Sequence, residues 1–134
     1  MRSTESREDY LETILVLSQQ NPYVRSIDVA EHLGVTKPSV SRAISLLKTA
    51  KLLEMDPHDG ALTLTEEGRV LAENVYARHR VLTVVLEQLG VSPEIAAQDA
   101  CRIEHVISEE SMDCLRRHLE QHAPGALNAP ASDN

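Results

Sequence analysis

The segment CRIEHVIS, residues 101–108, places three potential metal ligands within five positions. Cys101 offers a thiolate, Glu104 a carboxylate and His105 an imidazole. If the segment is helical, positions i, i+3 and i+4 lie on one face, so the three side chains can converge on one point. An amphipathic helix explains the same residues, because cysteine is often a small buried hydrophobe and Glu and His are common on solvated faces. The spacing alone leaves both interpretations open.

Further potential ligands stand on two other predicted helices. Asp9 and Glu12 lie one turn apart near the start of the first helix, where the helix macrodipole already favours acids. His79 interrupts an otherwise apolar helical face, a place where a satisfied core histidine is also common. Mixed oxygen, nitrogen and sulfur ligands favour a divalent first-row transition ion over calcium or magnesium, which prefer oxygen. His118 and His122, spaced i, i+4, could also bind a metal, but we interpret them as a solvated helix end.

The chain has none of the motifs that would predict an enzyme. It contains no GxSxG, no glycine-rich phosphate loop and no nucleophile paired with carboxylates. We therefore expect neither catalysis nor a small-molecule substrate.

The composition is that of a globular protein with a modest core. The 134 residues are 42% hydrophobic and 25% charged, enough for one compact domain or two very small ones. The N-terminus has no apolar signal region and no run approaches the ~18 apolar residues of a membrane span, so we expect a cytoplasmic protein with no membrane partner. Two cysteines without CxxC spacing do not predict a disulfide framework.

Positive charge is concentrated in one stretch of an acidic chain. The formal net charge is -8, which taken alone argues against nucleic acid as a partner. No acid occurs between Glu31 and Glu54, however, and that stretch carries four positive charges, Lys37, Arg42, Lys48 and Lys51. A local basic surface is therefore predicted inside an acidic protein.

Periodicity and capping signals predict a winged helix at the N-terminus. A helix is predicted over Glu8–Gln20, a second begins with Ser26 as its N-cap and stops at Gly34, and a third begins at the Thr36 cap with Pro38 just inside it. Two short helices joined by a tight turn match the helix-turn-helix pattern. Asp59-Gly60 between two apolar runs then predicts a hairpin.

Three more helices are predicted after the hairpin. The first opens at Thr65 and runs through Leu89, the second is capped by Ser92 and reaches about Ile107, and the third runs from Ser108 to about His122. The predicted fold is mainly α: a winged helix-turn-helix DNA-binding domain over residues 1–70 and an all-helical metal-binding and dimerisation domain over 71–123. Residues 124–134, rich in Pro, Ala and small polar residues, are predicted to be disordered. The second domain has too little core for its size, so we expect it to bury its apolar faces against a copy of itself.

Four blocks of sequence resemble a known family. They are EDYLETIL at 8–15, VTKPSVSRAISLL at 35–47, ARHRVL at 77–82 and DACRIEHVISEES at 99–111. In this order and spacing they are similar to the diphtheria toxin repressor and manganese transport regulator family, and the resemblance extends to about His122. It implies a metal-activated, homodimeric transcriptional repressor that binds a palindromic DNA operator. We expect the two-domain manganese form, without the SH3-like third domain of some members.

The resemblance also implies a ligand set. Matched by motif, the manganese branch places its ligands at Asp9, Glu12, His79, Glu104 and His105, with Glu12 bridging two ions. Cys101 instead matches the iron branch, which typically has methionine at the position of Asp9. The site is therefore a hybrid. We expect Mn²⁺ or Fe²⁺, up to two ions per subunit, and added affinity for Zn²⁺ or Co²⁺ in vitro from the thiolate.

On the DNA side, the second helix of the motif is expected to enter the major groove. Arg42 is the first candidate for a base contact, Lys37 and Lys48 are candidates for phosphate contacts, and His58 in the wing is a weaker one. The expected DNA-binding residues are Thr36, Lys37, Pro38, Ser39, Ser41, Arg42 and Lys48. The alternative is a winged-helix regulator or interaction module that does not sense metal.

Overall fold

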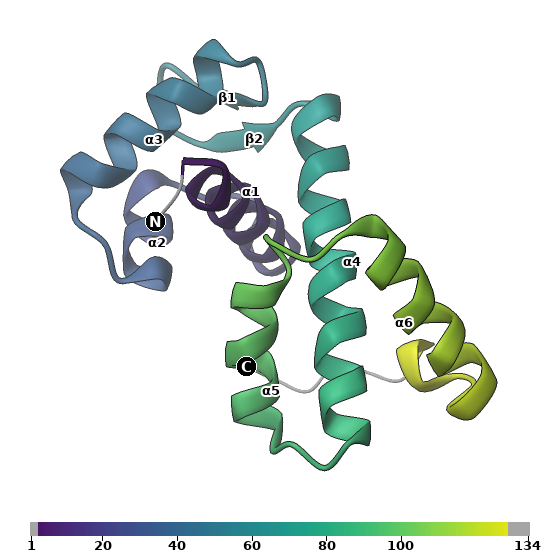
Figure 1. Ribbon diagram of the computed structural model, residues 1–134. Coiled ribbons are helices and arrows are strands. Elements are labelled where there is room, and N and C mark those ends of the chain that lie inside the picture. The colour runs from purple at the N-terminus through teal and green to yellow at the C-terminus, as the bar shows by residue number, and fades with distance from the viewer. Residues whose placement is uncertain (1–2, 129–134) are drawn as a thin grey trace. The chain divides into compact units, whose positions relative to one another are not determined.

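The computed structural model describes residues 3–128 of the chain. These residues form six α-helices, one two-stranded sheet and a short 3-10 helix (Figure 1). The chain divides into two compact units, residues 1–74 and 75–134, and each is described by itself. Among the described helices, none combines the length and the apolar character needed to cross a membrane.

The first unit begins with three helices and a hairpin. They are α1 (Ser3–Gln20), α2 (Ser26–Leu33), α3 (Lys37–Thr49), β1 (Leu53–Met55) and β2 (Leu62–Leu64). Gly34 ends α2 with a left-handed backbone, φ 67°, which glycine adopts without a steric penalty. The Thr36 hydroxyl accepts the backbone N–H of Ser39 at 3.3 Å and so caps α3. The helix-turn-helix predicted from these two signals is confirmed.

The start of α2 differs from the prediction. Ser26 is the first helical residue, and Arg25 holds the N-cap position with an extended backbone. The Asp28 carboxylate accepts the Arg25 N–H at 2.9 Å, so an acid inside the first turn stabilises this end. A serine preceding an apolar run was a weaker signal than an acid in the third helical position.

The hairpin forms where Asp59-Gly60 predicted it. β1 and β2 are antiparallel, with Leu53 opposite Leu64 and Met55 opposite Leu62. At the turn, one Asp56 carboxylate oxygen accepts the backbone N–H of His58 at 2.7 Å and of Asp59 at 3.2 Å. Helix-turn-helix followed by this hairpin is the predicted winged helix.

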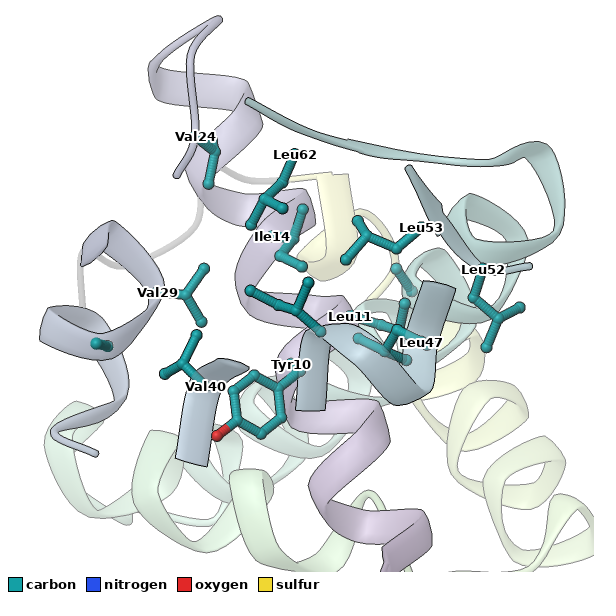
Figure 2. Close-up of a cluster of buried hydrophobic side chains, with 13 residues drawn as sticks. Tyr10, Leu11, Ile14, Val24, Val29, Val40, Leu47, Leu52, Leu53 and Leu62 are labelled. Carbon is teal, nitrogen blue, oxygen red and sulfur yellow. The ribbon is translucent and has the colours of Figure 1, made fainter. Parts of the chain in front are cut away.

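Branched aliphatic side chains fill the core of the first unit. Figure 2 shows them gathered between α1, α2, α3 and the hairpin. The labelled members are Tyr10, Leu11, Ile14, Val24, Val29, Val40, Leu47, Leu52, Leu53 and Leu62. Because α3 contributes Val40, Ile44 and Leu47 to this core, its opposite face is left to solvent.

The second unit contains most of α4 (Glu66–Gln88) together with α5 (Pro93–Ile103), α6 (Glu109–His122) and a 3-10 turn (Ala126–Asn128). Its core cluster is Val81, Leu82, Ala100, Met112 and Leu119. As predicted, α4 ends before Gly90, and Ser108 caps α6 by accepting the Ser111 N–H at 3.1 Å.

The predicted end of α5 is wrong. The helix stops at Ile103 rather than at about Ile107, and residues 104–106 form a turn. Capping α6 requires an extended backbone at Ser108, which has ψ 158°, so the chain must leave the helical conformation before that residue. Glu104 and His105 therefore lie in a turn and not on a helix.

The predicted disordered tail is also corrected in part. Residues 126–128 form the 3-10 turn, and the Arg80 guanidinium of α4 donates to the Leu127 carbonyl at 2.7 Å. Leu127 also packs against the core of the second unit. The Leu127 side chain and this partly buried hydrogen bond attach the segment to the second unit. The rest of the predicted tail, residues 129–134, lies outside the described range.

Gly68 provides a test of how the first turn of α4 is packed. A Cβ at this position would lie 2.9 Å from the Leu52 carbonyl carbon and closer still to its oxygen. Because both contacts are with backbone, we expect Gly68→Ala to lower the free energy of unfolding by about 2 kcal/mol or more and the melting temperature by about 10 °C. Thermal unfolding followed by circular dichroism measures this. The exposed Val70→Ala on the same helix is the control, and equal melting temperatures for the two variants would contradict the packing.

Candidate metal centre and DNA-binding surface

Glu104 is a fully buried carboxylate at the C-terminal end of α5. Its backbone N–H donates to the Ala100 carbonyl at 3.0 Å, and its exposed fraction is 0%. Neither carboxylate oxygen accepts a hydrogen bond from any described residue. Burying a charged carboxylate without a hydrogen bond costs free energy, and a nearby positive charge would reduce that cost.

Two imidazoles face the two oxygens of Glu104. The Nδ1 atom of His79, on α4, lies 3.4 Å from Oε2, and the Nε2 atom of His105 lies 3.6 Å from Oε1. Both side chains are largely buried, with exposed fractions of 12% and 4%. The carboxylate therefore has one imidazole nitrogen beside each oxygen.

Cys101 completes a group of three ligands in this unit. One ligand atom each from His79, Cys101 and Glu104 lies within 4.8 Å of the other two. Ligands bound to one transition ion at about 2.0–2.3 Å are spaced at roughly 3–4 Å, so small side-chain rotations would bring these atoms onto one ion. A thiolate, an imidazole and a buried carboxylate form a donor set that fits a divalent transition metal.

The structure does not bring together the three residues of CRIEHVIS in the way the sequence suggested. Cys101 is in the last turn of α5 and groups with His79, whereas His105 lies beyond the helix and approaches the other oxygen of Glu104. The partner that joins Cys101 and Glu104 is a side chain of α4. Spacing along one helix could not identify it.

Arg78 fixes the turn that carries Glu104 and His105. Its Nη1 atom donates to the Glu104 carbonyl at 3.1 Å, and its Nη2 atom lies 3.2 Å from a carboxylate oxygen of Glu109, the first residue of α6. One guanidinium therefore ties α4 to the end of α5 and the start of α6. Sequence reasoning missed this residue, and its one available signal was its position next to His79 in ARHR.

The remaining predicted ligands, Asp9 and Glu12, are in the first unit. They lie one turn apart on α1 and are both partly buried. Burial raises the pKa of the neighbouring Tyr10 phenol, and the negative charge of Asp9 raises it further. Two carboxylates at i and i+3 share one helix face, which allows both to serve one cation site.

The predicted DNA-binding residues lie on the outer face of α3. All seven are exposed: Thr36, Lys37, Pro38, Ser39, Ser41, Arg42 and Lys48. Their face carries no acid, because α3 has no acidic residue. His58 is exposed in the turn of the hairpin. The result is a basic, hydroxyl-rich helix surface opposite a buried apolar one, which suits contact with phosphates and base edges.

Comparisons with known proteins match both the N-terminal and the C-terminal part of the chain to one family. Residues 2–61 match the iron-dependent repressor N-terminal DNA-binding domain, and residues 65–123 match the metal-binding and dimerisation domain of the same family. The chain belongs to the iron-dependent repressor family. This family of DNA-binding transcriptional regulators is the one expected from the four sequence blocks.

Individual members of the family show which proteins the chain resembles. It is 41% identical over 115 residues to the transcriptional regulator MntR of Escherichia coli O6:H1 (strain CFT073), a match covering 86% of this chain and 74% of MntR. Its fold matches the metal-dependent transcriptional regulator MtsR with a TM-score of 0.78 at 30% identity, and a manganese-dependent transcriptional repressor in complex with manganese with the same two values. These matches cover 85% and 84% of this chain. The chain spans about half of each of those two proteins, 53% and 52% of their length.

The role of Arg78 in this repressor can be tested by removing its guanidinium. Arg78→Ala deletes the part-buried hydrogen bond to the Glu104 carbonyl, worth roughly 1.5–3 kcal/mol, and the ion pair with the exposed Glu109 carboxylate, worth about 0.2–1 kcal/mol, and so frees the turn that carries Glu104. We expect Co²⁺ affinity to fall about tenfold or more and the Co²⁺ absorption spectrum to change, with partial rescue in Arg78→Lys. The measurement is an anaerobic Co²⁺ titration of the purified protein.

The matched control is Arg80→Ala. It removes another α4 guanidinium, which donates a hydrogen bond to the Leu127 carbonyl at 2.7 Å. Equal Co²⁺ affinity and identical spectra for wild type and Arg78→Ala would contradict the positioning role.

Proposed function

We propose that this protein is a metal-activated, homodimeric transcriptional repressor that senses Mn²⁺ or Fe²⁺ and controls genes of manganese and iron homeostasis. The observation that carries the proposal is the buried Glu104 carboxylate, which has no hydrogen bond and faces two imidazoles in a member of a metal-dependent regulator family. Because its target is chromosomal DNA, the protein would act in the cytoplasm.

The metal ligands would come from both units. His79, Cys101, Glu104 and His105 would bind from the second unit, and the Asp9 and Glu12 carboxylates would complete the coordination from α1. Each oxygen of Glu104 faces a different imidazole, so Glu104 could act as a ligand together with either histidine, while the family resemblance assigns the bridging role to Glu12. A bound ion supplies the positive charge that this cluster of carboxylates and thiolate lacks.

The ligand types support Mn²⁺ or Fe²⁺ as the activating ions. Three carboxylates favour a hard divalent ion, whereas the Cys101 thiolate adds affinity for the borderline ions Zn²⁺ and Co²⁺. The manganese-dependent repressor of similar fold supports the hard-ion assignment. Cys101 therefore makes this site less selective against zinc than an all-oxygen and nitrogen site would be.

Metal binding would activate the protein by joining the two units. When ligands from α1 and from the second unit hold the same ions, the DNA-binding unit becomes fixed relative to the dimerisation unit. In a dimer this sets the distance between two α3 helices, which must match operator half-sites about one helical turn or a multiple apart. The operator is therefore expected to be palindromic. Bound divalent cations also reduce the net charge of -8 that repels phosphate.

The domain roles follow the predicted boundaries. Residues 1–70 would bind DNA, with Arg42 reading base edges and Lys37 and Lys48 contacting phosphates, while residues 71–123 would bind metal and form the dimer. Thr36, Pro38, Ser39 and Ser41 would lie against the groove beside Arg42.

The test of metal activation is anaerobic fluorescence anisotropy at fixed salt, using DNA from upstream of the protein's own gene and of neighbouring transporter genes. We expect Mn²⁺ or Fe²⁺ to tighten wild-type binding by at least tenfold, a coupling of about 1.4 kcal/mol, and Glu104→Gln to abolish the response. A response retained by Glu104→Gln would overturn the metal assignment. No response in wild type, with metal bound at stoichiometric amounts, would favour a winged-helix module that is not controlled by metal.

The variant Arg42→Ala tests whether Arg42 contacts base edges or phosphates. In the metal-loaded protein, Arg42→Ala should weaken operator binding by roughly 1–3 kcal/mol while leaving random DNA nearly unaffected. Lys48→Ala is the matched control, because a lost phosphate contact weakens both DNAs and lowers the salt slope by about one. Equal losses on operator and random DNA for Arg42→Ala would assign Arg42 to phosphate.

A further inference from the structure

His118 and His122 form a paired imidazole group at the end of α6. They are one turn apart on the helix, both side chains are exposed, and their ring centroids lie 4.3 Å apart with planes tilted by 38°. Neither residue belongs to the group of His79, Cys101 and Glu104. We propose that this pair is a second metal site, a two-histidine chelate for borderline divalent ions such as Ni²⁺, Zn²⁺ or Cu²⁺.

The geometry suits one shared ion. Two imidazole nitrogens bound at about 2.0–2.1 Å to the same ion lie roughly 3–3.5 Å apart. Rings whose centres are already 4.3 Å apart need only small rotations about their side-chain bonds to reach that spacing. The helix fixes both backbones, so binding the first imidazole brings the second to the ion without a further loss of translational entropy.

The charges around the pair also suit a cation. His122 is the last residue of α6, where the unsatisfied carbonyls give the helix its negative end and stabilise a positive charge. α6 carries four acidic residues and two arginines. Both arginines already contact α6 side chains: Arg116 pairs with Asp113 at 3.0 Å, and Arg117 donates to the Cys114 sulfur at 3.2 Å.

Cys114 does not share this site, although it lies one turn before His118. Residues 114 and 122 are separated by eight residues, or about 12 Å along the helix axis. A short cysteine side chain cannot reach an ion held between His118 and His122. Pairing of Cys114 with His118 is therefore an alternative chelate, and the position of Cys114 Sγ beside Arg117 disfavours it.

The ligand chemistry separates this site from the Glu104 centre. Two neutral imidazoles with no carboxylate follow the order of affinities Mn²⁺ < Fe²⁺ < Co²⁺ < Ni²⁺ < Cu²⁺ > Zn²⁺, so Mn²⁺ is expected to bind here weakly. A Mn²⁺ titration would count only the Glu104 centre. A Ni²⁺ or Zn²⁺ titration would count one more ion per chain. Binding of that additional ion at His118 and His122 would not indicate activation of DNA binding.

The experiment is an anaerobic calorimetric titration of Ni²⁺ into a protein that carries Glu104→Gln together with His79→Ala and Cys101→Ser, which removes the first group of ligands and leaves the sequence of α6 unchanged. We expect one Ni²⁺ equivalent whose affinity falls tenfold or more in His118→Ala and in His122→Ala, because each leaves a single imidazole. Two controls should leave it unchanged: His32→Ala, which removes an exposed histidine from α2, and Cys114→Ser. In the wild-type chain, Mn²⁺ stoichiometry should be the same with and without His118→Ala.

Two results would overturn the site. One is a Ni²⁺ equivalent that persists in both His118→Ala and His122→Ala, which would place the ion elsewhere. The other is loss of binding in Cys114→Ser with retention in His122→Ala, which would assign the ion to the alternative thiolate chelate. Because the titration uses Glu104→Gln, neither result depends on whether the Glu104 centre activates DNA binding.

Discussion

A carboxylate cannot be buried at low cost unless something compensates its charge, and Glu104 is the place in the second unit where this constraint acts. A buried acceptor without a hydrogen bond costs about 1–3 kcal/mol, and more when it is charged. Neither oxygen of Glu104 accepts a hydrogen bond from a described residue, although an imidazole nitrogen of His79 lies 3.4 Å from Oε2 and one of His105 lies 3.6 Å from Oε1. A divalent cation bound here would compensate the carboxylate and would use the two imidazoles as ligands, as the proposed function requires.

The surrounding structure follows from placing that carboxylate. α5 must end at Ile103 for the chain to reach the Ser108 cap, and this puts Glu104 at the helix end and His105 in the following turn. Arg78 then holds the turn through the Glu104 carbonyl and the Glu109 carboxylate. A guanidinium bound to the backbone and to an outer acid steadies the turn while leaving the Glu104 side chain available to a cation. The turn that carries Glu104 is thus held by contacts that do not use the Glu104 carboxylate oxygens.

Much of the fold was predictable because its signals are local. The Thr36 cap, the Gly34 stop, Asp59-Gly60 and the Ser108 cap each act within a few residues, and each appears in the structure where the sequence places it. Predictions failed where two local signals competed or where a distant partner decided. The Ser108 cap overrode the helical pattern that ran on to Ile107, and Asp28 shifted the N-cap of α2 from Ser26 to Arg25.

The candidate site shows the same limit. Residue types and spacing identified Cys101, Glu104 and His105, and the family resemblance joined His79 to them. Spacing could not show that the two imidazoles face different oxygens of Glu104, because that depends on the packing of α4 against α5 and the turn. Arg78 was missed for a related reason: its partners are a backbone carbonyl and an acid 26 and 31 positions further along the chain.

The central claim is that the Glu104 carboxylate is held for a cation and not for the fold. Its most direct test is the free energy of unfolding of wild type and Glu104→Gln, measured by urea denaturation first with a chelator and then with excess Mn²⁺. The account predicts that, without metal, the variant is as stable as wild type or more stable, because it removes a poorly compensated charge. With Mn²⁺ the order should reverse, since only wild type gains the stabilisation that ligand binding provides. A variant that is several kcal/mol less stable without metal, and a wild type that Mn²⁺ does not stabilise, would show instead that Glu104 is a structural partner of the two histidines.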